Sequence, residues 1–113
     1  MDLWKKGCRL ACEVYELTRD GAMEQDYAMR DQVRRSALSM PSNIAEGFER
    51  DSARAFANFL NIAKGSAREL RTQLYIASRL GYVTAERLQP LIAQVKEISR
   101  MASGLIRKLR DSE

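Results

Sequence analysis

The sequence predicts an all-α protein folded as an antiparallel up-down-up-down four-helix bundle. Helix-forming residues dominate the chain, which has only two prolines and six glycines. Apolar residues recur every three or four positions along four long stretches, and no alternating strand pattern of useful length occurs. The stretches are joined by short polar connections, which favour antiparallel packing of neighbouring helices.

Length and composition indicate one globular unit. The chain has 113 residues, of which 45% are hydrophobic and 30% charged. A chain of this size can build one core without support from a metal or a disulfide, and its composition is not that of a disordered protein. We therefore expect residues 1–113 to form a single four-helix bundle domain.

The first helix is predicted over Asp2–Arg19, with Asp2 as its N-terminal cap. Cys8 and Cys12 lie one helical turn apart in it, and the chain has no histidine that would complete a zinc site. We interpret both cysteines as small apolar residues. The polar segment Thr18–Met23 should then turn the chain back.

The second helix is predicted from Glu24 to Gly47, with a kink near Pro41. Proline lacks the backbone donor and clashes with the carbonyl four residues earlier, so a bend or restart is expected there. Asn43 and Glu46 have the spacing of a capping box, and Gly47 would then end the helix. Asn43 and Glu46 fall off the apolar stripe, so we expect them to face another helix or another subunit.

The third helix is predicted over Ala53–Leu80, capped by Asp51 or Ser52 and ended by Gly81. Beside its main apolar stripe runs a second, mixed face that favours oligomer formation. That face consists of Ile62, Ser66, Glu69, Gln73 and Leu80. The fourth helix should begin after Thr84 and run to about Arg110, with Pro90 near enough to its start to be tolerated.

Basic side chains at helical spacing are the best partner signal in the sequence. The third helix carries a row of four cations with one aromatic residue: Lys64, Arg68, Arg71, Tyr75 and Arg79. The fourth helix carries a second row, formed by Lys96, Arg100 and Arg107. Such rows suit phosphate recognition, but they also occur as solvated helix faces, so both interpretations stay open.

A polar cluster is predicted between the second and third helices. It consists of Asn43, Glu46, Ser66, Glu69 and Gln73. Carboxylates in helical bundles hold metals together with histidines of Glu-x-x-His pairs, and histidine is missing from this chain. We interpret the cluster as a structural hydrogen-bond network, with Arg35 or Arg50 available to neutralise a carboxylate.

The sequence contains no catalytic signature, so we expect a protein that is not an enzyme and uses no cofactor or metal. Gly-x-x-x-x-Gly-Lys, Gly-x-Gly-x-x-Gly and Cys-x-x-Cys motifs are all missing. The start of the chain does not read as a secretory signal, and no apolar run approaches the ~20 residues of a membrane span. We therefore expect a cytoplasmic protein with no membrane role.

Several motifs together resemble one protein family. The run SMPSNIAEGFER, preceded by QVRRSA and followed by FANFLNIAKGSARELRTQLYIASRLGY, is similar to four-helix bundle proteins encoded in intervening sequences of bacterial large-subunit ribosomal RNA genes. The resemblance runs from about Trp4 to Leu109 and extends more distantly to accessory proteins of diversity-generating retroelements. It implies the same fold and a ring-like homo-oligomer, a pentamer. Members of this family have no established activity.

The sequence and the resemblance lead to one functional hypothesis, one main alternative and a third interpretation. The hypothesis is a non-enzymatic homo-oligomer that binds structured RNA, or another nucleic acid, through its outer arginine-rich rows. The alternative is a protein-interaction scaffold whose basic faces only confer solubility. The third interpretation is an enzyme whose site forms between subunits, which would require a deep polar cleft lined by Glu69 of two neighbouring copies.

Overall fold

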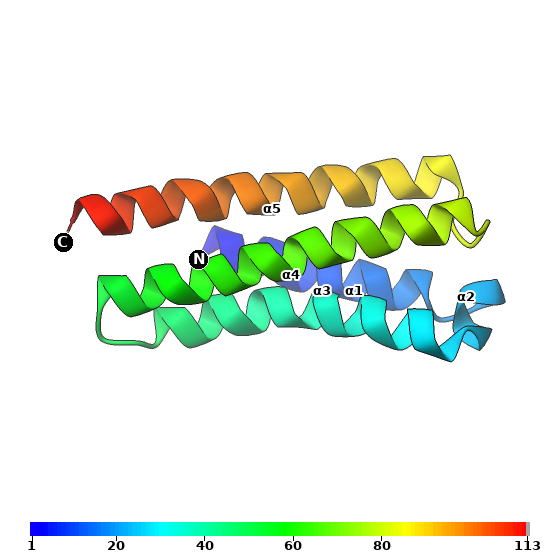
Figure 1. The fold of residues 1–113 in the computed structure, drawn as a ribbon, viewed down its shortest axis with the longest axis horizontal. Coiled ribbons are helices and arrows are strands. Elements are labelled where there is room, and N and C mark those ends of the chain that lie inside the picture. The colour runs from blue at the N-terminus through cyan, green and yellow to red at the C-terminus, as the bar shows by residue number, and fades with distance from the viewer. Residues whose placement is uncertain (113) are drawn as a thin grey trace.

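Four long helices and one short helix make up the structure, a computed structural model that describes residues 1–112. The elements are α1 (Asp2–Leu17), α2 (Gly21–Gln25), α3 (Tyr27–Phe48), α4 (Ala53–Arg79) and α5 (Ala85–Asp111). The four long helices lie lengthwise beside one another, and each runs opposite to the long helix before it (Figure 1). No strand occurs within residues 1–112. The predicted all-α helical bundle is confirmed.

Apolar side chains from all four long helices meet in one core. The largest side chains that are almost fully buried there include Leu10, Val14, Met40, Ile44, Leu60, Leu70, Leu74 and Val95. Burial of such a face provides most of the stability of a helix in a protein, since isolated helices of this length are marginal in water. The apolar residues that recur periodically in the sequence therefore form the core of the bundle.

The connection between α1 and α3 differs from the sequence prediction. The chain forms the one-turn helix α2 over Gly21–Gln25, and Met23, which is buried, holds this turn against the bundle. Helix α3 begins only after Asp26, whose carboxylate accepts a hydrogen bond from the backbone N–H of Met29 at 3.1 Å. Helix α3 thus begins at Tyr27, slightly after the predicted start near Glu24, because the capping side chain is Asp26.

Asp26 also links the connection between α1 and α3 to the loop between α4 and α5. Its second carboxylate oxygen accepts a hydrogen bond from the hydroxyl of Tyr82 at 2.8 Å, and Tyr82 lies between α4 and α5. The N–H of Met29 and then the Tyr82 hydroxyl lower the pKa of Asp26, and the same carboxylate raises the pKa of Tyr82. Both pKa shifts favour the state in which Asp26 is charged and Tyr82 is neutral.

We expect the Tyr82–Asp26 bond to contribute its full stability between about pH 4 and pH 10. A lowered carboxyl pKa contributes stability that is lost as the pH falls below the ordinary value of ~3.9, and a raised phenol pKa contributes stability that is lost as the pH rises above the ordinary value of ~10. Tyr82→Phe should therefore lower the melting temperature at pH 7, and wild type and variant should converge at both extremes. Tyr27→Phe makes the same change on an exposed ring and serves as the control. A difference that does not vary with pH would contradict this assignment.

An arginine side chain caps the C-terminal end of α1. Arg34 of α3 donates from Nε to the hydroxyl of Thr18 at 2.8 Å and from Nη2 to the Thr18 carbonyl at 3.4 Å. Its guanidinium also lies 4.6 Å from the centre of the Tyr15 ring. A charged donor at a helix C-terminus satisfies free carbonyls and complements the helix dipole.

Pro41 is accommodated inside a continuous helix. It is buried in α3, and its ring faces Gly7 of α1, where an added Cβ would lie 3.3 Å from the Cβ of Pro41. The side chain missing at Gly7 thus leaves room for the proline ring between the two helices. The kink near Pro41 stays a prediction.

The capping predictions succeed at three ends and fail at two. Asp2 does not cap α1, because it is the first residue of that helix, and the N-cap position is Met1, which makes no side-chain capping bond. Ser52 caps α4, Thr84 caps α5, and Gly81 follows α4 with a φ of 83° in the left-handed region. Helix α3, however, ends at Phe48 rather than at Gly47. Gly47 has helical backbone, and its role is to let α3 approach Phe56 and Phe59 of α4.

Candidate nucleic-acid interface

The basic row of α4 lies on the side of this helix that faces away from α3. The hydroxyl of Ser66 donates to Ser39 Oγ of α3 at 2.7 Å, which marks the α3 side of α4. At 100° per residue, the row falls on the other side of the core stripe, towards α5. Arg68 and Arg79 are exposed, whereas Lys64 and Arg71 are half-buried at the base of the row.

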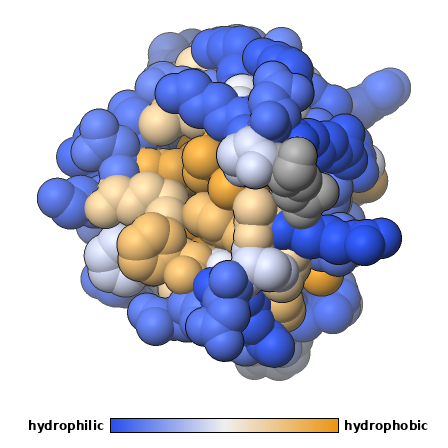
Figure 2. Space-filling model, turned by 90° about the vertical axis from the view of Figure 1, so that its left-hand side faces the viewer, coloured by the Kyte–Doolittle hydropathy of each residue, from blue (hydrophilic) through white to orange (hydrophobic). Residues whose placement is uncertain are grey.

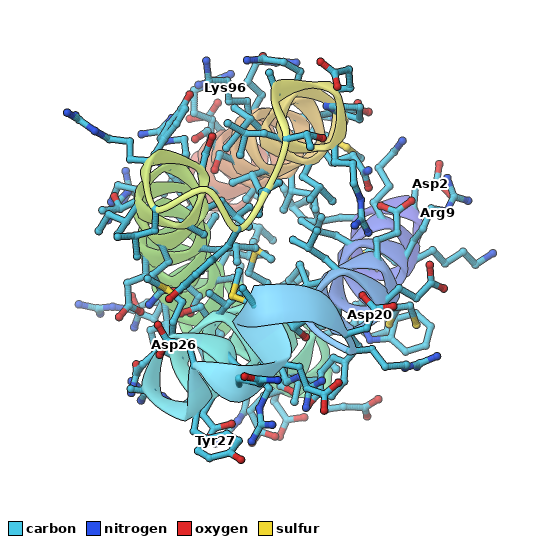
Figure 3. The ribbon with its side chains drawn as sticks, turned by 90° about the vertical axis from the view of Figure 1, so that its right-hand side faces the viewer. Asp2, Arg9, Asp20, Asp26, Tyr27 and Lys96 are labelled. Atoms are coloured by element: carbon cyan, nitrogen blue, oxygen red, sulfur yellow. The ribbon has the colours of Figure 1, made fainter. Side chains whose placement is uncertain are left out.

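The basic row of α5 lies on the outer side of that helix, towards α4. Glu97 pairs with Lys6 of α1 at 3.0 Å, and Gln94 donates to Glu13 of α1 at 2.6 Å, which marks the α1 side of α5. Lys96 points outward from α5 on the side of α4 (Figure 3). Lys96, Arg100 and Arg107 are all exposed.

The two rows meet as one surface, which we call the basic face. It comprises Lys64, Arg68, Arg71, Tyr75 and Arg79 of α4 with Lys96, Arg100 and Arg107 of α5. Arg68 lies 12 positions before Leu80 and Lys96 lies 12 positions after Thr84, so the two occupy the same level of the α4–α5 hairpin. Lys64 and Arg100 match in the same way at 16 positions. Packed helix axes lie about 8–10 Å apart, so the backbone positions of these four cations are near one another, and we call the four residues the compact group.

The charge of the chain is concentrated on these two helices. Helix α4 holds five basic residues and one acidic residue, and α5 holds six and three, which gives them +7 together. Since the whole chain carries +4, the remainder carries −3. Within residues 1–112, no cation of the basic face forms an ion pair. The pKa of Glu97 is lowered mainly by Lys6 and to a smaller extent by Arg100.

The predicted polar network forms only in part. Asn43 donates from Nδ2 to the Ser39 carbonyl at 2.8 Å and to Ser39 Oγ at 3.0 Å, and Ser66 donates to the same Ser39 Oγ. Ser39, which is missing from the predicted set, therefore joins Asn43 to Ser66. Its sequence signal is its place one helical turn before Asn43, the spacing at which a side chain reaches a backbone carbonyl.

Three residues of the predicted network lie outside this hydrogen-bonded group. Glu46 is exposed and pairs with Arg50 at 2.6 Å, one turn later in sequence, so it forms no capping box with Asn43. Glu69 is exposed. The Oε1 atom of Gln73 is buried and has no hydrogen-bond partner in the part of the chain that the structure describes.

Glu69 and Gln73 line a hollow of about 780 Å³ on the α3–α4 side of the bundle. Ser39, Ile62 and Ser66 contribute to the same hollow, and Arg68 of the basic face borders it as well. The side chains of Ile62 and Leu80 on this side of α4 are 51% and 55% exposed. This α3–α4 hollow thus combines apolar surface with an unsatisfied buried acceptor.

The described residues offer little for metal or thiol chemistry. No group of three or more potential metal ligands comes together within residues 1–112. Burial, followed by the nearby Cys12, raises the pKa of the Cys8 thiol, which favours the less reactive protonated form. None of the helices in the described part is long and apolar enough to cross a membrane.

Comparison with known proteins identifies a family and solved structures of similar fold. The sequence model described as "23S rRNA-intervening sequence protein" matches residues 1–104. A crystal structure from Bacteroides thetaiotaomicron, described as a protein with unknown function from the S23 ribosomal protein family, is similar in fold with a TM-score of 0.84. The two are 26% identical, and the similarity covers 92% of this chain and 97% of that one. No curated protein gives a significant match.

Proposed function

Because the chain belongs to the family of 23S rRNA-intervening sequence proteins, we propose that it is a non-enzymatic cytoplasmic protein that binds structured RNA through the basic face. The observation that carries this proposal is the concentration of unpaired cations on α4 and α5. The charge of +7 on these two helices, against −3 on the rest of the chain, places the positive potential on one part of the molecule.

The chemistry of the basic face suits phosphate. Five of its seven cations are arginines, whose planar guanidinium groups can bind phosphate oxygens through two parallel hydrogen bonds. Because these side chains have no acidic partner among the described residues, phosphate binding would break no ion pair. Their spacing along two parallel axes matches a charged backbone better than a single anion.

The proposal is tested by binding of the purified protein to a labelled, structured 23S rRNA fragment at about 50 and 200 mM salt. Each neutralised phosphate releases counterions, so six or more contacts should weaken binding by on the order of 10³ over this range. Saturable, strongly salt-dependent binding is the expected result. No binding at the lower salt concentration would contradict the proposal and leave a scaffold role as the better account.

We also propose that the protein assembles with copies of itself, and the family resemblance implies a ring of five. The α3–α4 hollow supports assembly on this side of the bundle. Ile62 and Leu80 would gain burial there, and a donor from a neighbouring copy would satisfy Gln73 Oε1.

Ile62→Glu is expected to convert the assembly to monomers, since a carboxylate would be buried in the contact without a partner. Native mass spectrometry of the purified protein gives the subunit number directly. Asn61→Glu introduces the same charge one residue earlier, at an exposed position on a different side of α4, and should leave the assembly intact. Equal behaviour of the two variants would place the contact elsewhere.

A protein-interaction scaffold is the second candidate, and one surface favours it. At the end of the bundle where α3 leads into α4, apolar residues gather inside a hydrophilic rim (Figure 2). Trp4 and Phe48 line a hollow of about 220 Å³ there and are 42% and 60% exposed. Phe48→Ser should abolish the binding of a protein partner at this hollow while leaving RNA binding unchanged.

A further inference from the structure

Tyr75 is the aromatic side chain of the basic face, and its environment differs from that of the other tyrosines. The guanidinium of Arg34 covers the Tyr15 ring at 4.6 Å, and that of Arg30 covers the Tyr27 ring at 4.8 Å. Tyr82 donates its hydroxyl to Asp26. Within residues 1–112, Tyr75 has neither a hydrogen bond nor a stacked cation, and it is 41% exposed.

We propose that Tyr75 stacks against an unpaired nucleobase, so that the RNA bound by the basic face is single-stranded at this point. The inference rests on the proposed RNA binding and names the form of RNA that the site accepts. An exposed aromatic ring provides a stacking surface for any base, whereas a paired base inside a duplex has both of its faces covered.

The cations around Tyr75 are placed to hold the backbone on either side of such a base. Arg71 and Arg79 lie one helical turn before and after Tyr75, which is ~6 Å along the axis in each direction. The compact group formed by Lys64, Arg68, Lys96 and Arg100 begins about 10 Å further along α4 from Tyr75. A strand anchored by its phosphates to that group could continue along α4 and present a base to Tyr75.

The residue types of the α4 row support two different roles, phosphate binding by its cations and base stacking by Tyr75. On α4 the row has cations at Lys64, Arg68, Arg71 and Arg79, and it is interrupted only by Tyr75. A row that only attracts a duplex backbone has no need of an aromatic ring at one of its positions. The phenol ring contributes no charge there, so its contribution to binding should be independent of salt.

The test compares two RNA ligands of equal phosphate number, a single-stranded oligonucleotide of about 11 nucleotides and a duplex of about 6 base pairs. Fluorescence anisotropy at fixed salt gives the affinity of wild type, Tyr75→Ala, Tyr75→Phe and Tyr27→Ala for each. We expect Tyr75→Ala to weaken single-strand binding about tenfold and duplex binding hardly at all, consistent with the loss of one stacked base. Tyr75→Phe should bind like wild type, because the ring is retained.

Tyr27 provides the matched control, since it is an exposed tyrosine that points outward from α3, away from α4 and α5 (Figure 3). Tyr27→Ala should leave both affinities unchanged. The slope of affinity against salt should be the same for wild type and Tyr75→Ala, whereas Arg68→Ala should reduce it by about one phosphate contact.

Failure of this inference is distinguishable from failure of the proposed function. If wild type binds both ligands with strong salt dependence and Tyr75→Ala changes neither affinity, the basic face binds RNA and the stacking role is overturned. If Tyr75→Ala weakens duplex binding as much as single-strand binding, selection of unpaired bases is overturned. If wild type binds no RNA at low salt, the proposed function itself fails.

Discussion

Gly47→Ala is expected to lower the free energy of unfolding by about 1 kcal/mol, although alanine is the better helix former. A Cβ at this position would lie 2.7 Å from Phe59 Cβ and 2.9 Å from Phe56 Cδ1. The Phe59 Cβ is fixed to the backbone of α4 and cannot rotate away, so the end of α3 and the start of α4 would have to separate. Overpacking at such a contact typically costs 1–3 kcal/mol, which outweighs the gain of ~1 kcal/mol in helix propensity.

Gly104→Ala provides a matched control with the opposite sign. Gly104 also lies inside a helix, but a Cβ there would meet only the guanidinium tip of Arg107 at 3.9 Å. This variant should raise the free energy of unfolding by up to ~1 kcal/mol. Urea unfolding of the three proteins measures both effects. An increase for Gly47→Ala like that for Gly104→Ala would show that α3 and α4 do not approach so closely.

Charge reversal across the hairpin should affect RNA binding as strongly as reversal along one helix. Arg68→Glu/Lys96→Glu changes two residues of the same level on α4 and α5, whereas Arg68→Glu/Arg71→Glu changes two neighbours on α4. Each pair removes two phosphate contacts and adds repulsion, so we expect both double variants to lose at least about 100-fold in affinity at 100 mM salt. Equal losses would mean that the RNA contacts both helices.

Arg9→Glu/Arg19→Glu makes the same change in net charge at exposed positions outside the basic face. It should weaken binding only a few-fold, through the overall field of the protein. A loss as large as that of the hairpin variants would indicate attraction by net charge rather than by a defined surface. An unchanged affinity for Arg68→Glu/Lys96→Glu would move the RNA site away from α4 and α5.

The helices and most of their ends are readable from the sequence, because these features depend on local spacing. Apolar periodicity indicates four long helices, and Ser52, Thr84 and Gly81 act within one turn of the ends that they close. The start of α3 is one of the exceptions. Asp26 and Glu24 are both plausible near a helix start, and Asp26 caps α3 while it also binds Tyr82, a residue distant in sequence.

The sequence alone determined which residues share a helix face, including both basic rows, because the 100° turn per residue is the same in every helix. Only the tertiary structure decided that these rows join into one face, that Ser39 links Asn43 to Ser66, and that Gly47 is needed for contact with Phe59. The physical reason is that each of these features depends on how one helix is rotated and spaced against another, which the packing of the whole core sets.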